Sequence, residues 1–227
     1  MKSATRFCQL ALLTGLGLSA VFSAMNVQAS DKTGMYAVTV TNLTRGETFT
    51  PIMVATHKKD THVFTLGEPA STELAAIAEG GDFGPLSTAL TDSGVAYDIA
   101  TNGDLLAPGA STTIMVKMAD DFEFVTVTSM MIPTNDGFIA VNGIKGPMKK
   151  HDAKVIMSPA YDAGSERNSE LCAYIPGPPC GNGNVHDTEP AEGYVHIHAG
   201  IHGSGSLDAS EFDWRNPVAV VVIQRTR

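Results

Sequence analysis

The sequence predicts an all-β protein, an antiparallel β-sandwich with one short helix and long loops. Short runs rich in β-branched and aromatic residues recur along the chain, and clusters of Gly, Pro, Asn, Asp and Ser separate them. Short strands divided by turn signals favour a sandwich over parallel βαβ units. The first run also alternates between apolar and polar or small residues, as a half-buried strand does.

The strands follow from periodicity and composition. Within Met35–Thr41, Tyr36, Val38 and Val40 fall on one face, because successive side chains of a strand point to opposite sides. The final run is apolar on both faces, which is typical of a strand covered on each side or lying near the sandwich centre. The remaining strands are predicted at Pro51–His57, His62–Leu66, Thr112–Met118, Phe122–Ile132, Phe138–Ile144, Ala153–Met157, Tyr194–Ala199 and Val218–Gln224.

One helix is predicted over Thr72–Glu79. Ser71 is a favourable N-cap residue, and Gly80-Gly81 supplies the stop signal. We expect this helix to be a connection laid over one end of the sandwich. Asp82 to Pro108 is rich in Gly, Asp, Ser and Thr and is interpreted as long loops. The sequence contains no internal repeat and no interdomain linker, so residues 30–227 are predicted to form one domain.

Residues 1–29 have the pattern of a cleavable export signal. Lys2 and Arg6 form a positive start, Leu10 to Phe22 is apolar, and Val27-Gln28-Ala29 offers a small-residue cleavage site. A membrane anchor is disfavoured, because the apolar run is short for a bilayer and glycines and serines interrupt it. The protein is therefore expected to be periplasmic or extracellular.

The chain is acidic, with 15 basic and 24 acidic residues and a formal net charge of −9 at pH 7. This balance argues against nucleic acid as a partner, and against anionic membranes unless calcium intervenes. A protein, glycan or matrix ligand remains open as the partner.

Cys172 and Cys180 are the two cysteines outside the export signal, and Pro-rich, turn-forming sequence separates them. In an oxidising compartment such a pair is expected to form a disulfide. Their spacing excludes a redox CxxC motif, so a structural role is predicted.

Two polar segments, each following a β-rich run, carry the acids of greatest interest. Pro133 to Phe138 contains Asp136, and Pro159 to Glu170 contains Asp162 and Glu166. If the two preceding strands are neighbours, the three carboxylates converge at one end of a sheet, where only a cation would stabilise them together. Hard oxygen ligands suit Ca²⁺. The alternative from spacing alone is that these are ordinary solvated loop acids.

The segment Asp162-Ala-Gly-Ser-Glu166, with Asn135-Asp136 at the end of another strand, resembles the spondin domain of F-spondin and its relatives. Further stretches that resemble the family are Tyr36–Asn42, Leu74–Gly81, Pro133–Gly143, Tyr161–Glu170 and Gly193–Leu207. The resemblance implies a C2-like β-sandwich and one calcium ion, held here by Asp136, Asp162 and Glu166. Two positions depart from the family pattern: the third acid is usually Asp, and animal members have Trp at position 137, where this chain has Gly. Glutamate adds one methylene of reach, which alters the geometry or affinity expected of the site.

A competing metal site is suggested by His196-Ile-His198-Ala-Gly-Ile-His202. His196 and His198 share a face if this segment is a strand, and His202 or His186 could add further ligands. Imidazoles of this kind bind zinc or copper. The alternative is that the three histidines hydrogen-bond to the loop backbone, which the resemblance favours.

Catalytic motifs are not evident. The chain has no Gly-x-Ser-x-Gly elbow, no phosphate-binding Gly loop and no EF-hand, because Arg167 occupies the position where that loop needs Gly. We therefore expect an exported calcium-binding β-sandwich that acts as a binding or adhesion module and is not an enzyme, with calcium ordering the loops at one end. The alternative is a periplasmic His-ligated zinc or copper protein, either a metal carrier or a small redox enzyme.

Overall fold

A computed structural model describes residues 33–182, 185–187 and 190–226. These described residues belong to one compact unit. The predicted export signal at 1–29 lies outside the described residues and stays a prediction. Among the described residues, no helix combines the length and the apolar character needed to cross a bilayer.

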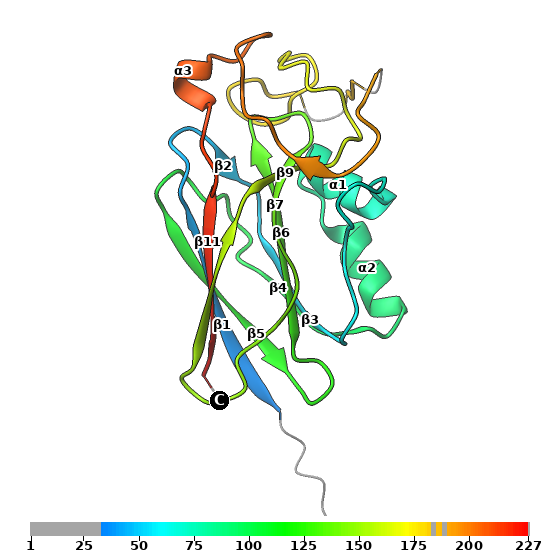
Figure 1. Cartoon of the computed structure of the whole chain (residues 1–227), viewed down its shortest axis with the longest axis vertical. Coiled ribbons are helices and arrows are strands. Elements are labelled where there is room, and N and C mark those ends of the chain that lie inside the picture. The colour runs from blue at the N-terminus through cyan, green and yellow to red at the C-terminus, as the bar shows by residue number, and fades with distance from the viewer. Residues whose placement is uncertain (1–32, 183–184, 188–189, 227) are drawn as a thin grey trace, which may run out of the picture. The chain divides into compact units, whose positions relative to one another are not determined.

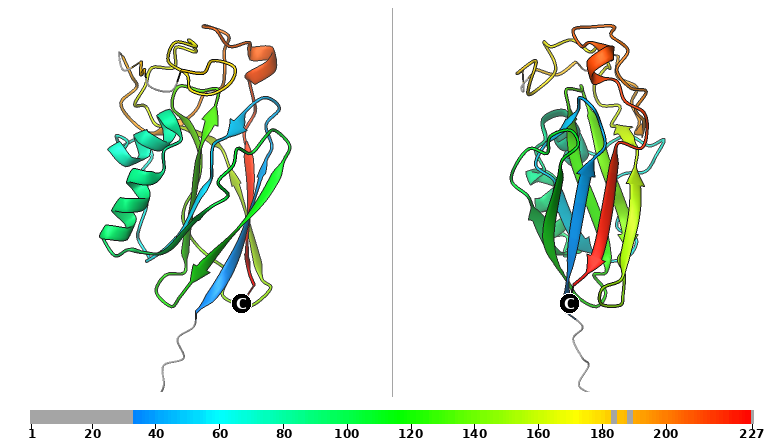
Figure 2. Two further views of the ribbon diagram at one scale, coloured as in Figure 1. Left: turned by 180° about the vertical axis from the view of Figure 1, so that it is seen from behind. Right: turned by 90° about the vertical axis from the view of Figure 1, so that its left-hand side faces the viewer.

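Two antiparallel sheets form the body of the domain, which confirms the predicted sandwich (Figure 1). The first sheet has the strand order β5-β1-β11-β8, and these four strands lie in a row in the right-hand view of Figure 2. The second has the order β10-β9-β7-β6-β3-β4, with β2 paired to β6. The first comprises β1 (Gly34–Asn42), β5 (Ser111–Met118), β8 (Ala153–Ser158) and β11 (Ala219–Arg225), and the second β2 (Thr48–Phe49), β3 (Met53–His57), β4 (Ala96–Thr101), β6 (Phe124–Ile132), β7 (Gly137–Lys145), β9 (Ala160–Asp162) and β10 (His196–Ile197).

The main core lies between the two sheets. In β1 the predicted alternation is confirmed, because Tyr36, Val38 and Val40 are fully buried while the intervening residues are partly exposed. Strand β11 also buries one face only, and it lies inside the four-stranded sheet between β1 and β8. Its outward valines, Val220 and Val222, are half-buried, so the expected cover on both faces is not observed.

Helices form a third layer on the outer face of the seven-stranded sheet (Figures 1 and 2). Helix α1 (Thr72–Gly80) has Ser71 as its N-cap and Gly81 in the left-handed conformation after its end, as predicted. Helix α2 (Gly84–Asp92) packs beside it, and α3 (Ala209–Phe212) is a single turn near the loops. Because helices cover the sheet, β3 is buried along its whole length, as is β6 beyond its first residue.

Three expectations about local structure are wrong. Asp82 to Pro108 contains α2 and β4, so it is not simply long loops, and the domain has more than the one predicted helix. Residues 62–66 are not a strand, because the side chain of Asn142, rather than a neighbouring backbone, hydrogen-bonds to Val63 N and Phe64 O. The strand predicted at Tyr194–Ala199 is reduced to the two residues of β10.

The segment after β9 is tied by a covalent link. Cys172 and Cys180 form a disulfide, as the sequence predicted. The bridge closes a short loop within the irregular region at the end of the sandwich that also carries the acids described next. It has a structural role there and fixes the chain between β9 and β10.

Candidate metal centre

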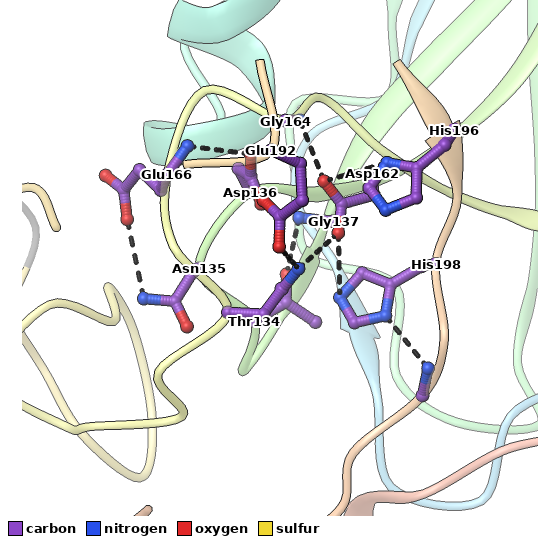
Figure 3. A network of polar contacts seen from close by, with 12 residues as sticks. Thr134, Asn135, Asp136, Gly137, Asp162, Gly164, Glu166, Glu192, His196 and His198 are labelled. Carbon is purple, nitrogen blue, oxygen red and sulfur yellow. Dashed lines mark hydrogen bonds and ion pairs between the residues drawn. The ribbon is translucent and has the colours of Figure 1, made fainter. Parts of the chain in front are cut away.

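The pairing of three neighbouring strands brings the predicted acids and histidines together. Asp162, the last residue of β9, pairs with Gly137 of β7 on one side and with His196 of β10 on the other. Asp136 directly precedes Gly137, and its carboxylate lies near enough to that of Asp162 for the Asp162 charge to raise the pKa of Asp136 (Figure 3). Residues separated by up to 60 positions in the sequence therefore meet at one end of one sheet.

Asp136 organises the loop that follows β9. Its Oδ2 atom accepts hydrogen bonds from the backbone amides of Ser165, at 2.8 Å, and Glu166, at 3.0 Å. Its Oδ1 atom is buried and has no hydrogen-bond partner among the described residues. Burial, and then the neighbouring carboxylate of Asp162, raise the pKa of Asp136 to about 7. A buried acceptor with no donor is the feature of this site that most needs a ligand.

Asp162 is fully buried and lies at the centre of the cluster. Its Oδ1 accepts the Gly164 amide at 2.8 Å, and its Oδ2 accepts the Asn168 side-chain amide at 2.6 Å. Burial raises the pKa of Asp162 to about 6, although these two hydrogen bonds favour the ionised form. Two imidazoles also face it: His196 Nδ1 lies 3.5 Å from Oδ1 and His198 Nε2 lies 3.9 Å from Oδ2 (Figure 3).

Glu166 is fully buried, but its carboxylate points away from the two aspartates (Figure 3). Its Oε1 contacts His186 Nδ1, and its Oε2 accepts a long hydrogen bond of 3.5 Å from the Asn135 side chain. Burial raises the pKa of Glu166 to about 7, partly offset by the hydrogen bond to His186. The structure thus brings Asp136 and Asp162 together, while Glu166 joins them through its backbone amide.

His198 acts as a hydrogen-bonding group in this arrangement. Its Nδ1 accepts the Gly200 amide at 3.0 Å, so the proton of the neutral ring lies on Nε2, which faces Asp162. Burial lowers the pKa of His198 to about 3, with His196 and His202 adding to the effect. The ring packs on Trp214 with centroids 4.9 Å apart. This Nε2 has no hydrogen-bond partner among the described residues, and because it carries the proton it has no lone pair for a metal.

His202 does not join His196 and His198 in a set of ligands. Its side chain is exposed, and its backbone amide donates to Glu170 Oε1 at 2.6 Å. Glu170 also accepts from the Ser204 amide at 2.7 Å, so this buried carboxylate holds the glycine-rich turn after β10. The sequence did not point to Glu170 or Asn168 as functional residues. Both lie in the polar loop that follows β9, and their place in that loop was the only signal for them.

Oxygen ligands fit the pair of aspartates. Asp136 and Asp162 are both buried, and the ion-pair contacts found for Asp162 in the described part of the chain are with His196 and His198 rather than with lysine or arginine. The unpartnered Oδ1 of Asp136 offers a hard donor at the position where calcium is expected. The third expected donor, the carboxylate of Glu166, would have to turn from His186 to reach the pair.

The Spondin_N family model matches residues 39–169, more than half of the chain. The chain belongs to the spondin N-terminal domain family. The matched part of the spondin domain includes Asp136, Asp162 and Glu166, whereas His196, His198 and His202 lie beyond it. A search of curated proteins found no match to the chain. Membership of this family, together with the disulfide, indicates an extracellular or secreted module of the binding type.

Proposed function

We propose that this spondin domain is a calcium-dependent binding or adhesion module, exported from the cell and without enzymatic activity. Asp136 and Asp162 would hold the ion. The carboxylate of Glu166, the third that the family resemblance implies, faces His186 and is left out of the proposed calcium site. Bound calcium would supply positive charge and oxygen coordination to carboxylates that are otherwise buried together.

One observation carries the proposal: Asp136 Oδ1 is buried without a hydrogen-bond donor, directly beside the carboxylate of Asp162. A buried unsatisfied acceptor costs about 1–3 kcal/mol, and more when it is ionised. Two adjacent carboxylates add mutual repulsion, which raises the pKa of Asp136. A divalent cation removes both costs at once.

The same acids hold the loops that would form the binding surface. Asp136 accepts the amides of the 163–166 loop, and Asn168 links Asp162 to Glu192, with Nδ2 3.1 Å from Glu192 Oε1. An ion bound to the aspartates therefore orders loops that are far apart in the sequence. The surface at this end of the sandwich is where we place recognition of a protein, glycan or matrix ligand.

The test is thermal or urea unfolding of the purified chain, without a histidine tag, in calcium and in chelator. Calcium at a hundred times its dissociation constant should raise the free energy of unfolding by about 2.7 kcal/mol if only the native state binds it. Asp162→Asn should remove this gain. Asp120→Asn, a substitution of an exposed acid in the turn after β5, is the matched control and should keep it. Equal stability of the wild-type protein in calcium and in chelator would refute the proposal.

The histidine-ligated zinc or copper protein is the rival function. The approach of His196 Nδ1 to Asp162 favours it, whereas the proton on His198 Nε2 and the exposure of His202 count against it. Elemental analysis separates the two. A stoichiometric transition metal that is lost in His196→Gln, but retained in His186→Gln, would support the rival and not the calcium module.

A further inference from the structure

A second cluster of metal-ligating side chains lies on the other side of Glu166. Glu79, Glu166 and His186 each offer a ligand atom, and the three atoms lie within 4.8 Å of one another. His186 Nδ1 contacts Glu166 Oε1 and lies 3.1 Å from Glu79 Oε2. Among the described residues this is the one set of three His, Cys, Asp or Glu side chains found to be so close.

Three separate segments bring these groups together. Glu79 lies in the last turn of α1, and Glu166 lies in the loop after β9. The Arg167 amide donates to the Asp187 carbonyl at 2.6 Å, so the backbone beside Glu166 is held against the backbone beside His186. The meeting of Glu166 and His186 thus follows from a main-chain contact as well as from their side chains.

The charges of the cluster call for a cation. Glu79 lies at the C-terminal end of α1, where the helix dipole disfavours a carboxylate, and the last turn has no basic residue. The side chain of Glu166 is only 1% exposed, so water screens its charge poorly. The one proton on His186 Nδ1 can form a good hydrogen bond with only one of the two carboxylates at a time. A divalent ion would compensate both.

The donor set favours a metal different from calcium. One imidazole nitrogen with two carboxylate oxygens is a zinc-type set, whereas calcium prefers oxygen alone. Ligand atoms about 2.0–2.1 Å from a tetrahedral zinc ion lie about 3.3 Å apart, close to the 3.1 Å between His186 Nδ1 and Glu79 Oε2. The side chain of His186 is 41% exposed, so an ion there could exchange with solvent and keep a water as its fourth ligand.

We propose that Glu79, Glu166 and His186 form a second metal site, specific for a zinc-class divalent cation and distinct from the Asp136–Asp162 pair. The length of the Glu166 side chain matters to the proposed site, because the carboxylate reaches His186 across the gap between the two segments. An aspartate at this position would be one methylene shorter and would not make the same contact. The ion would fasten the 185–187 segment to α1.

The test is calorimetric titration of the tag-free chain with Zn²⁺ in the presence of excess Ca²⁺, which keeps zinc from the aspartate pair. One equivalent should bind, and Glu79→Gln and His186→Gln should each weaken binding at least tenfold. Glu166→Asp should weaken zinc binding similarly while retaining calcium binding. Glu73→Gln, a substitution of a partly exposed acid in the first turn of the same helix, is the matched control and should bind zinc like the wild type.

The two metal proposals fail independently. Asp162→Asn should lose calcium stabilisation and still bind zinc, whereas His186→Gln should do the reverse. The zinc proposal is overturned if the wild-type chain binds no zinc, or if both Glu79→Gln and His186→Gln bind it unchanged. It is likewise overturned if zinc binding disappears in His196→Gln but not in His186→Gln.

Discussion

Single buried acids differ in what surrounds them, and Glu47 shows the extreme case. Asp136 and Glu166 are buried beside amides, histidines and each other's loops. Glu47 is also fully buried, but neither carboxylate oxygen has a hydrogen-bond partner among the described residues. Burial therefore raises the pKa of Glu47 well above its usual value. The neutral acid is the form that the fold accommodates.

Glu47 should make stability fall as pH rises. A raised folded-state pKa contributes stability that is complete below the unfolded-state pKa, near 4.3, and is lost as pH increases toward the folded-state value. Within that window the loss from one proton approaches about 1.4 kcal/mol per pH unit. Glu47→Gln cannot ionise, so it should be more stable than the wild type at pH 7, by an amount that shrinks toward pH 4.

Urea unfolding of both chains from pH 4 to pH 8, with calcium saturating, measures this difference. Glu68→Gln, a substitution of an exposed acid, serves as the control and should follow the wild type at every pH. A stability difference between Glu47→Gln and the wild type that is constant across the range would show that Glu47 ionises normally in the folded protein.

The loop from Asp162 to Glu166 depends on one glycine. Gly164 has φ +65°, a conformation that side chains disfavour, and a Cβ there would overlap the backbone nitrogen and oxygen of Tyr194. The Gly193 amide donates to the Gly164 carbonyl at 2.8 Å, so the loop and the approach to β10 lie in direct contact. This contact holds Asp162 and His196 in register.

Gly164→Ala should therefore destabilise the domain by more than about 1 kcal/mol and weaken calcium binding. Gly94→Ala is the matched control, because Gly94 also has a positive φ but a Cβ there would meet nothing within 4 Å. That variant should lose stability through backbone strain alone and bind calcium normally. Unfolding free energies and calcium titrations of the two variants decide the point: equal calcium affinities would mean that the contact with Tyr194 does not hold the site.

Secondary structure was predictable from the sequence where a single local signal, such as strand alternation or helix capping, indicated one conformation. The alternation of β1 and the caps of α1 each point to one answer, and both predictions are confirmed. Helix α2 was not predicted because Gly, Ser and Thr, which are poor helix formers, make up four of its nine residues. Pro85 in its first turn and the pair Leu86 and Leu90 on one face are nevertheless helix signals. For residues 62–66 composition was misleading, because the side chain of Asn142 takes the hydrogen bonds that a neighbouring strand would have supplied.

The site was predictable in its members more than in its geometry. The predicted strands that precede the two acidic segments correspond to β6 and β8, which lie in different sheets and are not neighbours. Asp136 and Asp162 meet for another reason: β9, which the sequence did not predict, pairs with β7. Nothing in the spacing indicated that β10 adds His196 to the same row, or that Glu166 turns toward His186 and Glu79. These contacts depend on strand order and on helix placement, which are tertiary properties that local sequence does not encode.

At the scale of the whole molecule, a layered body supports an irregular end. The two sheets and the α1–α2 layer bury most of the apolar residues, whereas both proposed metal sites lie where the long loops gather (Figure 1). The loop amides of Gly164, Ser165 and Glu166 donate to carboxylates rather than to a strand. The order of this end thus depends on the state of the acids more than on the sheets.

Amide hydrogen exchange should detect this division. With calcium at a hundred times its dissociation constant, amides of the 163–166 loop should exchange about a hundredfold more slowly than in chelator, if their opening requires release of the ion. Buried sheet amides that exchange only through global unfolding should slow by the same factor. Amides of α2, which open locally and lie away from the aspartates, should keep their rates and so provide the internal control. Equal slowing of α2 and the loop, or unchanged loop rates, would mean that calcium does not organise this end of the domain.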